Sequence, residues 1–102
     1  MVTPRKNTKL AKRRRIMKKV DGSKAFYLNN GKKLTDLFEL AKELDRMDDN
    51  LFRDHVNDER NDFSRWVEDV FGERKLSRRL NEVNNRTGAQ ITILKHLIGG
   101  LS

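Results

Sequence analysis

The chain has no cysteine among its 102 residues, and it has few residues of the kinds that carry enzyme chemistry. Without cysteine, a disulfide framework, a thiolate metal site and a cysteine nucleophile are excluded. His55 and His96 are the only histidines, no serine stands in a nucleophile-elbow pattern, and no glycine-rich phosphate loop occurs. We therefore expect a protein that is not an enzyme and that holds no cofactor and no metal ion.

Long apolar runs are missing as well. The longest stretch without a charged residue, Thr87 to Leu94, is far shorter than the ~20 apolar residues of a membrane-spanning helix. The N-terminal region is basic but lacks the apolar segment and the small-residue cleavage site of a secretory signal. The sequence thus predicts a cytoplasmic protein that does not enter a membrane.

Positive charge is concentrated at the N-terminal end. The formal net charge is +8, yet residues 1–24 hold ten lysines or arginines and one acidic residue, which gives +9 for this segment alone. The remaining residues hold thirteen lysines or arginines and fourteen acidic residues, which gives a net charge of −1. Like charges at this density resist compaction. We expect residues 1–24 to form a disordered basic arm and residues 25–102 to form one small helical domain.

The basic arm favours nucleic acid as its partner, because each phosphate neutralised by lysine or arginine releases a condensed counterion. The arm has no aromatic residue for base stacking and no Arg-Gly repeat, so contact with the phosphate backbone of DNA or structured RNA is expected. The residues expected to make it are Arg5, Lys6, Lys9, Lys12, Arg13, Arg14, Arg15, Lys18 and Lys19.

Three other interpretations of the arm stay open. It is also typical of a solubilising tail, and its cations would suit an anionic membrane surface, although the arm lacks the aromatic residues that such a surface favours. The run from Lys12 to Arg15, followed by Lys18-Lys19, matches a nuclear import signal of low specificity.

A second basic cluster of Arg74, Lys75, Arg78 and Arg79 either extends the phosphate contact or is a solvated helix face.

From Lys24 onward the pattern predicts a mainly α fold, a compact bundle of four to five short helices preceded by a short hairpin. Ala25 to Leu28, followed by Asn29-Asn30-Gly31, predicts a strand and a tight turn, with Lys32 to Leu34 returning. Thr35 is the expected cap of a helix with apolar residues at helical spacing. Asp48 or Asp49 should cap a shorter helix that ends near Val56, and Asn57 to Arg60 should be a polar loop.

Asn61 is the expected cap of the third helix, which has the strongest apolar stripe and ends at a left-handed Gly72. Its residues Phe63, Trp66 and Phe71 are interpreted as core. A fourth helix should run from Glu73 or Lys75 to about Asn84-Asn85, and a fifth from Thr87 to Gly99-Gly100. A strand at Ile91 to Ile93 is the alternative there. His55 should be a packed side chain with one hydrogen bond and not a metal ligand.

Three short motifs lie between Phe26 and about Leu80: Gly31-x-x-Leu34, Phe52-x-x-His55-Val56, and Asn61-Asp62-Phe63-x-x-Trp66-x-x-Asp69-Val70-Phe71-Gly72. Through them, roughly half of the chain resembles an uncharacterised, mainly archaeal family of small helical domains. The resemblance implies an archaeal source and a helical fold, and it implies no active site because that family has no assigned chemistry.

These observations together predict a nucleic-acid-binding protein associated with chromatin, the nucleoid or the ribosome. The alternative is a protein–protein interaction module, in which the helical domain docks a partner and the basic arm meets an acidic protein surface. The two differ in their response to salt, because binding to a polyanion weakens steeply as salt rises.

Overall fold

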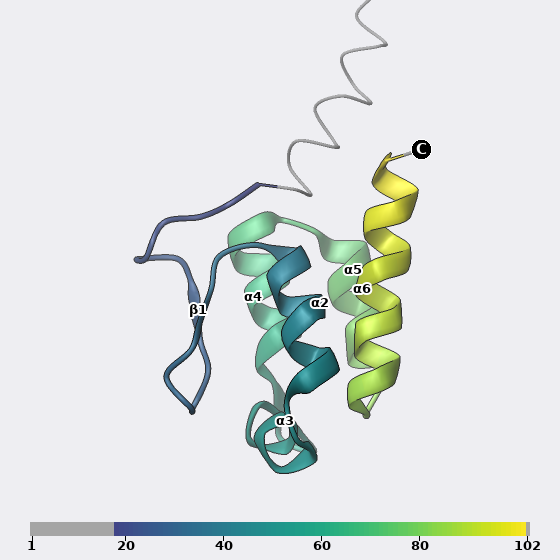
Figure 1. Ribbon diagram of the computed structural model, residues 1–102. Coiled ribbons are helices and arrows are strands. Elements are labelled where there is room, and N and C mark those ends of the chain that lie inside the picture. The colour runs from purple at the N-terminus through teal and green to yellow at the C-terminus, as the bar shows by residue number, and fades with distance from the viewer. Residues whose placement is uncertain (1–17, 102) are drawn as a thin grey trace, which may run out of the picture.

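The computed structural model describes residues 18–101. Within this range the longer helices α2 (Leu37–Arg46), α4 (Asp62–Phe71), α5 (Arg74–Asn81) and α6 (Arg86–Leu101) run alternately down and up, and the short α3 (Asp49–His55) closes one end of the bundle (Figure 1). The mainly helical fold with a leading hairpin is confirmed. Seven of the expected phosphate-binding residues lie outside the described range: Arg5, Lys6, Lys9, Lys12, Arg13, Arg14 and Arg15.

Two antiparallel hairpins accompany the helices. Strand β1 (Phe26–Tyr27) pairs with β2 (Lys33–Leu34), with Phe26 opposite Leu34, and Gly31 in the turn adopts φ 91°. The predicted hairpin is therefore present. The second hairpin was not predicted: β3 (Val56–Asn57) pairs with β4 (Arg60–Asn61), where the sequence indicated only a polar loop. The side chain of Asn57 accepts a hydrogen bond from the Glu59 amide at 3.0 Å and so shapes its turn.

The start of α2 differs from the prediction by one residue. Asp36 is the cap, because its carboxylate accepts a hydrogen bond from the Glu39 amide at 2.7 Å. Thr35 instead donates its backbone N–H and its hydroxyl to the Glu39 carboxylate, at 2.7 and 2.9 Å. The arrangement is a reciprocal cap in which each side chain satisfies an amide of the other's segment. Thr35 as the cap is thus wrong, although it belongs to the same network.

The later helix boundaries are partly confirmed. Asp48 caps α3 and Asn61 caps α4, and Gly72 ends α4 with φ 67° in the left-handed region. Helix α5 starts at Arg74, within the predicted range, but ends at Asn81, before the expected stop.

Helix α6 starts earlier and ends later than predicted. The Asn85 side chain accepts a hydrogen bond from the Gly88 amide at 2.6 Å, and Thr87 is not the cap. The helix continues through Gly99 to Leu101, because the chain does not turn left-handed at Gly99 as it does at Gly72. The segment from Ile91 to Ile93 is helical and is not a strand.

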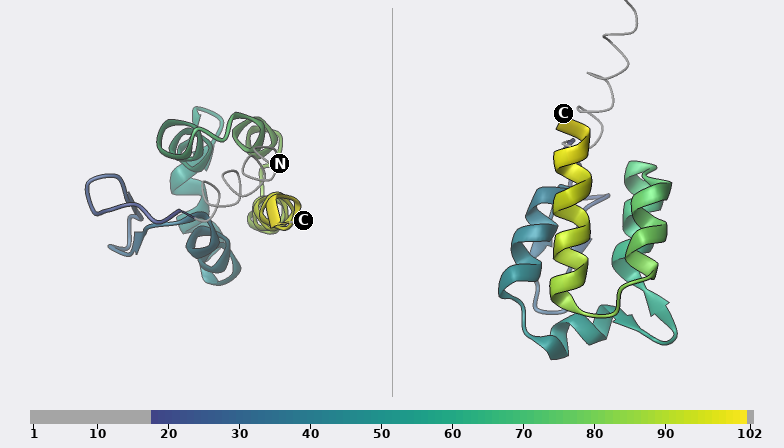
Figure 2. Two further views of the ribbon diagram at one scale, coloured as in Figure 1. Left: turned by 90° about the horizontal axis from the view of Figure 1, so that it is seen from above. Right: turned by 90° about the vertical axis from the view of Figure 1, so that its right-hand side faces the viewer.

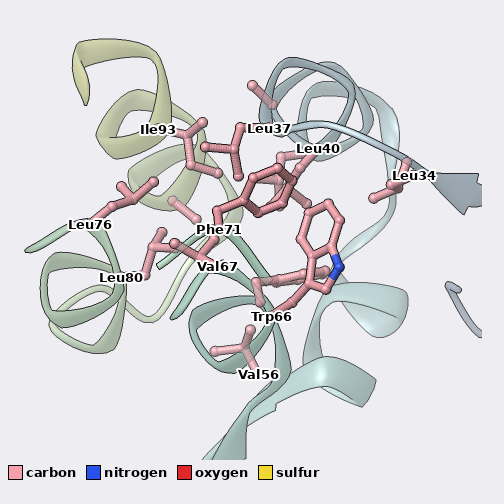
Figure 3. Packing of buried hydrophobic residues seen from close by; sticks show 14 of the residues in the cluster. Leu34, Leu37, Leu40, Val56, Trp66, Val67, Phe71, Leu76, Leu80 and Ile93 are labelled. Carbon is pink, nitrogen blue, oxygen red and sulfur yellow. The ribbon is translucent and has the colours of Figure 1, made fainter. Parts of the chain in front are cut away.

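The core lies between the helix pairs α4–α5 and α2–α6 (Figures 2 and 3). Phe63, Trp66 and Phe71 are 1%, 7% and 4% exposed, which confirms their interpretation as core. Fully burying one large apolar side chain contributes about 1.5–3 kcal/mol. The largest fully buried side chains come from α2, α4, α5 and α6: Leu37, Leu40, Leu44, Phe63, Val67, Leu76, Leu80 and Ile93.

The packed part of the chain begins before Lys24, inside the segment that charge assigns to the arm. Val20 is buried, and its amide donates a hydrogen bond to the Thr35 carbonyl at 2.8 Å. The ammonium group of Lys19 lies 2.9 Å from the Asp36 carboxylate. The indole N–H of Trp66 donates to the Lys24 carbonyl at 2.8 Å. The junction of arm and domain is therefore tied to the start of α2 and to α4.

We expect Glu39→Gln to lower the free energy of unfolding by about 1 kcal/mol at neutral pH. Hydrogen bonds from the Thr35 amide and hydroxyl, with the charge of Lys19, hold the pKa of the Glu39 carboxyl below its ordinary value of 4.5. A carboxyl with a lowered folded-state pKa stabilises the fold above its unfolded pKa and loses this effect as the pH falls through the folded pKa. Denaturant unfolding should therefore show wild type and variant converging as the pH falls below 4.5 and through the lowered folded-state pKa of Glu39.

Glu82→Gln is the matched control for this experiment. Glu82 is exposed and its carboxylate pairs with no side chain in the described part of the chain. A difference between wild type and Glu39→Gln that persists at acid pH would contradict the proposed role of the carboxylate charge.

Candidate nucleic-acid interface

Four cations lie together on the exposed side of helix α5. Arg74, Lys75, Arg78 and Arg79 are all exposed, while Leu76, Ser77 and Leu80 on the other side are at most 3% exposed. None of the four cations forms an ion pair with an acidic side chain, as far as the structure describes the chain. The sequence prediction that this cluster points away from Leu76 and Leu80 is confirmed.

The local sequence of α5 disfavours a helix. Arg74 and Lys75 lie in the first turn, next to the positive end of the helix dipole. The pairs Arg74–Arg78 and Lys75–Arg79 place like charges four residues apart, which costs about 0.2–0.5 kcal/mol for each pair. Glu73 at the cap position makes no capping hydrogen bond with its side chain. Helix α5 is therefore held by the packing of Leu76 and Leu80, and its charges are not explained by stability.

The first turn of α5 lies at the end of the bundle where the arm joins. The amide of Val20 bonds to the chain just before α2, so the arm leaves beside the start of that helix. His96, late in α6, has Nε2 3.1 Å from the carboxylate of Glu73 at the start of α5. The start of α2, the start of α5 and the end of α6 thus share one end of the bundle (Figure 1).

Two of the arm residues expected to contact phosphate, Lys18 and Lys19, lie within the described range, and they differ in whether an acidic side chain pairs with them. Lys18 is exposed. Lys19 is held by Asp36 at 2.9 Å and Glu39 at 3.4 Å, and its hydrogen bond to Asp36 raises the pKa of its ammonium group. Because its charge is already neutralised by two acids of the domain, Lys19 is a weaker candidate for phosphate contact than the sequence indicated.

Most other cations of the domain are paired or isolated. Lys32 and Arg46 lie near Glu43, Arg60 near Asp62, and Arg86 near Asp49, at 3.1–3.8 Å. Other exposed cations without ion pairs in the described range lie singly on different elements: Lys24, Lys33, Lys42, Arg53, Arg65 and Lys95. Four unpaired cations on a single helix face therefore set α5 apart.

The two histidines are structural in this arrangement. His55 is 5% exposed; its Nδ1 lies 3.0 Å from the Asp62 carboxylate, and its Nε2 accepts a hydrogen bond from the Asn29 amide at 3.3 Å. It makes two hydrogen bonds where one was expected. His96 pairs with Glu73 between α6 and α5, a contact that the sequence did not indicate because the two residues are far apart along the chain. Within residues 18–101, no cluster of three or more histidine, aspartate or glutamate side chains could hold a metal ion.

Comparison with protein-family models, with curated proteins and with solved structures finds no match to this chain. The resemblance to an archaeal family stays a prediction, and the function is inferred from the geometry of the described residues. In the part of the chain that the structure describes, no helix has the length and apolar character needed to cross a membrane.

Proposed function

We propose that the protein binds DNA or structured RNA without catalysing a reaction, through phosphate contacts of the basic arm and of the exposed face of α5. The observation that carries the proposal is the set of four unpaired cations on α5, which persists although it weakens the helix. A phosphate backbone would neutralise these charges and release counterions.

The position of the arm supports a continuous contact. The arm joins the domain at the end where α5 begins (Figure 1), so a nucleic acid lying along α5 also passes the root of the arm. A helix of eight residues is about 12 Å long, which matches the rise of about three stacked nucleotides. The proposed setting is the nucleoid or the ribosome of an archaeal cell, where such a polyanion is abundant.

The test replaces Arg74, Lys75, Arg78 and Arg79 by glutamine in the full-length chain. The slope of log affinity against log salt should become shallower by about 0.9 for each phosphate that the variant no longer neutralises, or about 3–4 in total. The free energy of unfolding should stay equal or rise by up to about 1 kcal/mol, because like-charge repulsion is removed. Binding to duplex DNA and to a folded RNA is measured across a salt series.

A variant with the same loss of charge is the control: Lys33, Lys42, Arg46 and Lys95, all exposed and away from α5, replaced by glutamine. If α5 makes the contact, this variant should keep most of the slope and affinity. An equal loss in both variants would show that net charge alone matters and would contradict the role of α5.

A second candidate function, a protein-docking module, is favoured by apolar side chains exposed on α2 and α6. Phe38 is 46% exposed, Ile91 45% and Ile98 65%. Docking through these apolar side chains would depend little on salt. If binding depends steeply on salt and the glutamine variant of α5 reduces this dependence, the nucleic-acid function is supported over the docking function.

A further inference from the structure

A polar cleft of about 640 Å³ lies at the far end of α5 from the arm. It is bordered by the β3–β4 hairpin, by the last residue of α5 and by the chain that leads to α6, all at the lower end of the bundle (Figure 2). Its volume falls within the range of roughly 300–1,000 Å³ that is typical of small-molecule sites.

Two free amide side chains line this cleft. Asn81 and Asn84 are exposed, and their side chains make no hydrogen bond to any residue that the structure describes. Asn61, by contrast, fixes the wall: its side chain accepts a hydrogen bond from the Ser64 amide at 2.9 Å and donates to the Leu80 carbonyl at 3.1 Å. The hairpin is thus joined to the end of α5, and the amides of Asn81 and Asn84 stay available to a ligand.

A guanidinium group is also fixed at the cleft. Arg60 donates to the Asp54 carbonyl at 2.9 Å and lies 3.5 Å from the Asp62 carboxylate. These contacts hold the planar group in one orientation. A fixed guanidinium plane is a surface on which an unstacked base can lie.

The charge of the cleft differs from that of the α5 face. Arg53 and Arg60 are balanced in the lining by Asp58 and Glu59, so the cleft has no excess positive charge to attract a phosphate. Arg78, one turn before Asn81, belongs to the cationic face. Because Arg78 and Asn81 are about 4.5 Å apart along the helix axis, a strand whose phosphate meets Arg78 brings its neighbouring base to the cleft.

We propose that this cleft receives an unpaired adenine of the nucleic acid whose phosphates contact α5; the inference rests on the proposed function. An asparagine amide offers a donor beside an acceptor, which matches the amino group and ring nitrogen on one edge of adenine. The carboxylates of Asp58 and Glu59 provide further acceptors for the amino group. Backbone contacts fix the position of the strand, and the cleft supplies the sequence preference that the arm lacks.

The experiment compares binding of oligoadenylate and oligouridylate of equal length to the full-length chain. Wild type should prefer oligoadenylate by roughly tenfold. The double variant Asn81→Ala with Asn84→Ala should lose this preference while keeping its affinity for oligouridylate and its salt slope. Both residues have negative φ and no side-chain bond to a described residue, so alanine fits, and thermal unfolding checks that the fold is kept.

Asn50→Ala is the matched control, because Asn50 is exposed on α3 and does not line the cleft. It should retain the preference for oligoadenylate. Equal affinity of wild type for both polymers, or a preference that survives in the double variant, would overturn the adenine site and leave the phosphate contact of α5 standing. Absence of binding to both oligomers would likewise overturn the adenine site. Only absence of binding to duplex DNA and to folded RNA at low salt, measured on the same chain, would overturn the proposed function.

Discussion

Deleting residues 1–17 is expected to reduce affinity for duplex DNA or folded RNA by ~10³-fold or more at low salt. This segment holds seven lysines or arginines and no acidic residue. Each phosphate that the shortened chain no longer neutralises should make the salt slope shallower by about 0.9. The truncated chain keeps the α5 face, so weak binding with a shallow salt dependence should remain. Binding isotherms of both chains across a salt series measure the effect.

The truncation must remove the arm without removing residues that pack against the domain. A chain that starts at residue 25 loses Val20, which is buried, and Lys19, which bridges to Asp36. It also loses the Lys24 carbonyl that accepts the Trp66 indole. Cutting before Lys18 spares all three contacts. A full-length chain with the seven cations replaced by glutamine controls for length, and unchanged affinity in either chain would refute the arm as the contact.

Phe63→Ala is expected to cost about 3–5 kcal/mol of stability, the largest loss from a single substitution that we expect in this domain. The Phe63 ring is 1% exposed and lies 4.9 Å from the ring of Phe26 and 5.4 Å from that of His55, measured between centroids. It therefore joins the first hairpin, α3 and α4. A domain of this size has a total stability of roughly 4–12 kcal/mol, so the variant should lose from about a quarter to all of it. Denaturant unfolding followed by circular dichroism measures the loss.

Phe38→Ala removes the same atoms from the surface of α2, where the side chain is 46% exposed. We expect it to cost less than about 1 kcal/mol. Similar losses in both variants would mean that the ring cluster around Phe63 is not the centre of the core.

The sequence predicted the helices well where the signal was local. Asn61, Gly72 and the stripe through Phe63, Trp66 and Phe71 combine a cap, a stop and helical periodicity within one short segment, and all were confirmed. Boundaries failed where two candidates of similar strength stood side by side. Asp36 replaced Thr35 because Glu39 satisfies the Thr35 amide, a contact that depends on the folded turn. Gly99 did not end α6, since a glycine stops a helix only where the chain turns left-handed.

Contacts between distant segments gave no signal in the sequence. The pairs Lys19–Asp36 and His96–Glu73 join residues that only the fold brings together. The same holds for the cleft, whose lining comes from α3, the second hairpin, the last residue of α5 and the chain that follows it. The cations of α5, in contrast, could be found from the sequence, because Leu76 and Leu80 fix the buried side of the helix and thus the exposed one.

The hydrogen bond between Trp66 and Lys24 has an optical consequence. Trp66 is the single tryptophan of the chain, it is 7% exposed, and its indole N–H is 2.8 Å from the backbone where the arm meets the domain. Indole fluorescence from this protein therefore arises at one place, Trp66 in α4, which contacts the segment that leads into the first hairpin. A ligand that alters the contact between Trp66 and Lys24 should therefore shift the emission wavelength, so a titration of the unlabelled protein can be followed by its own tryptophan.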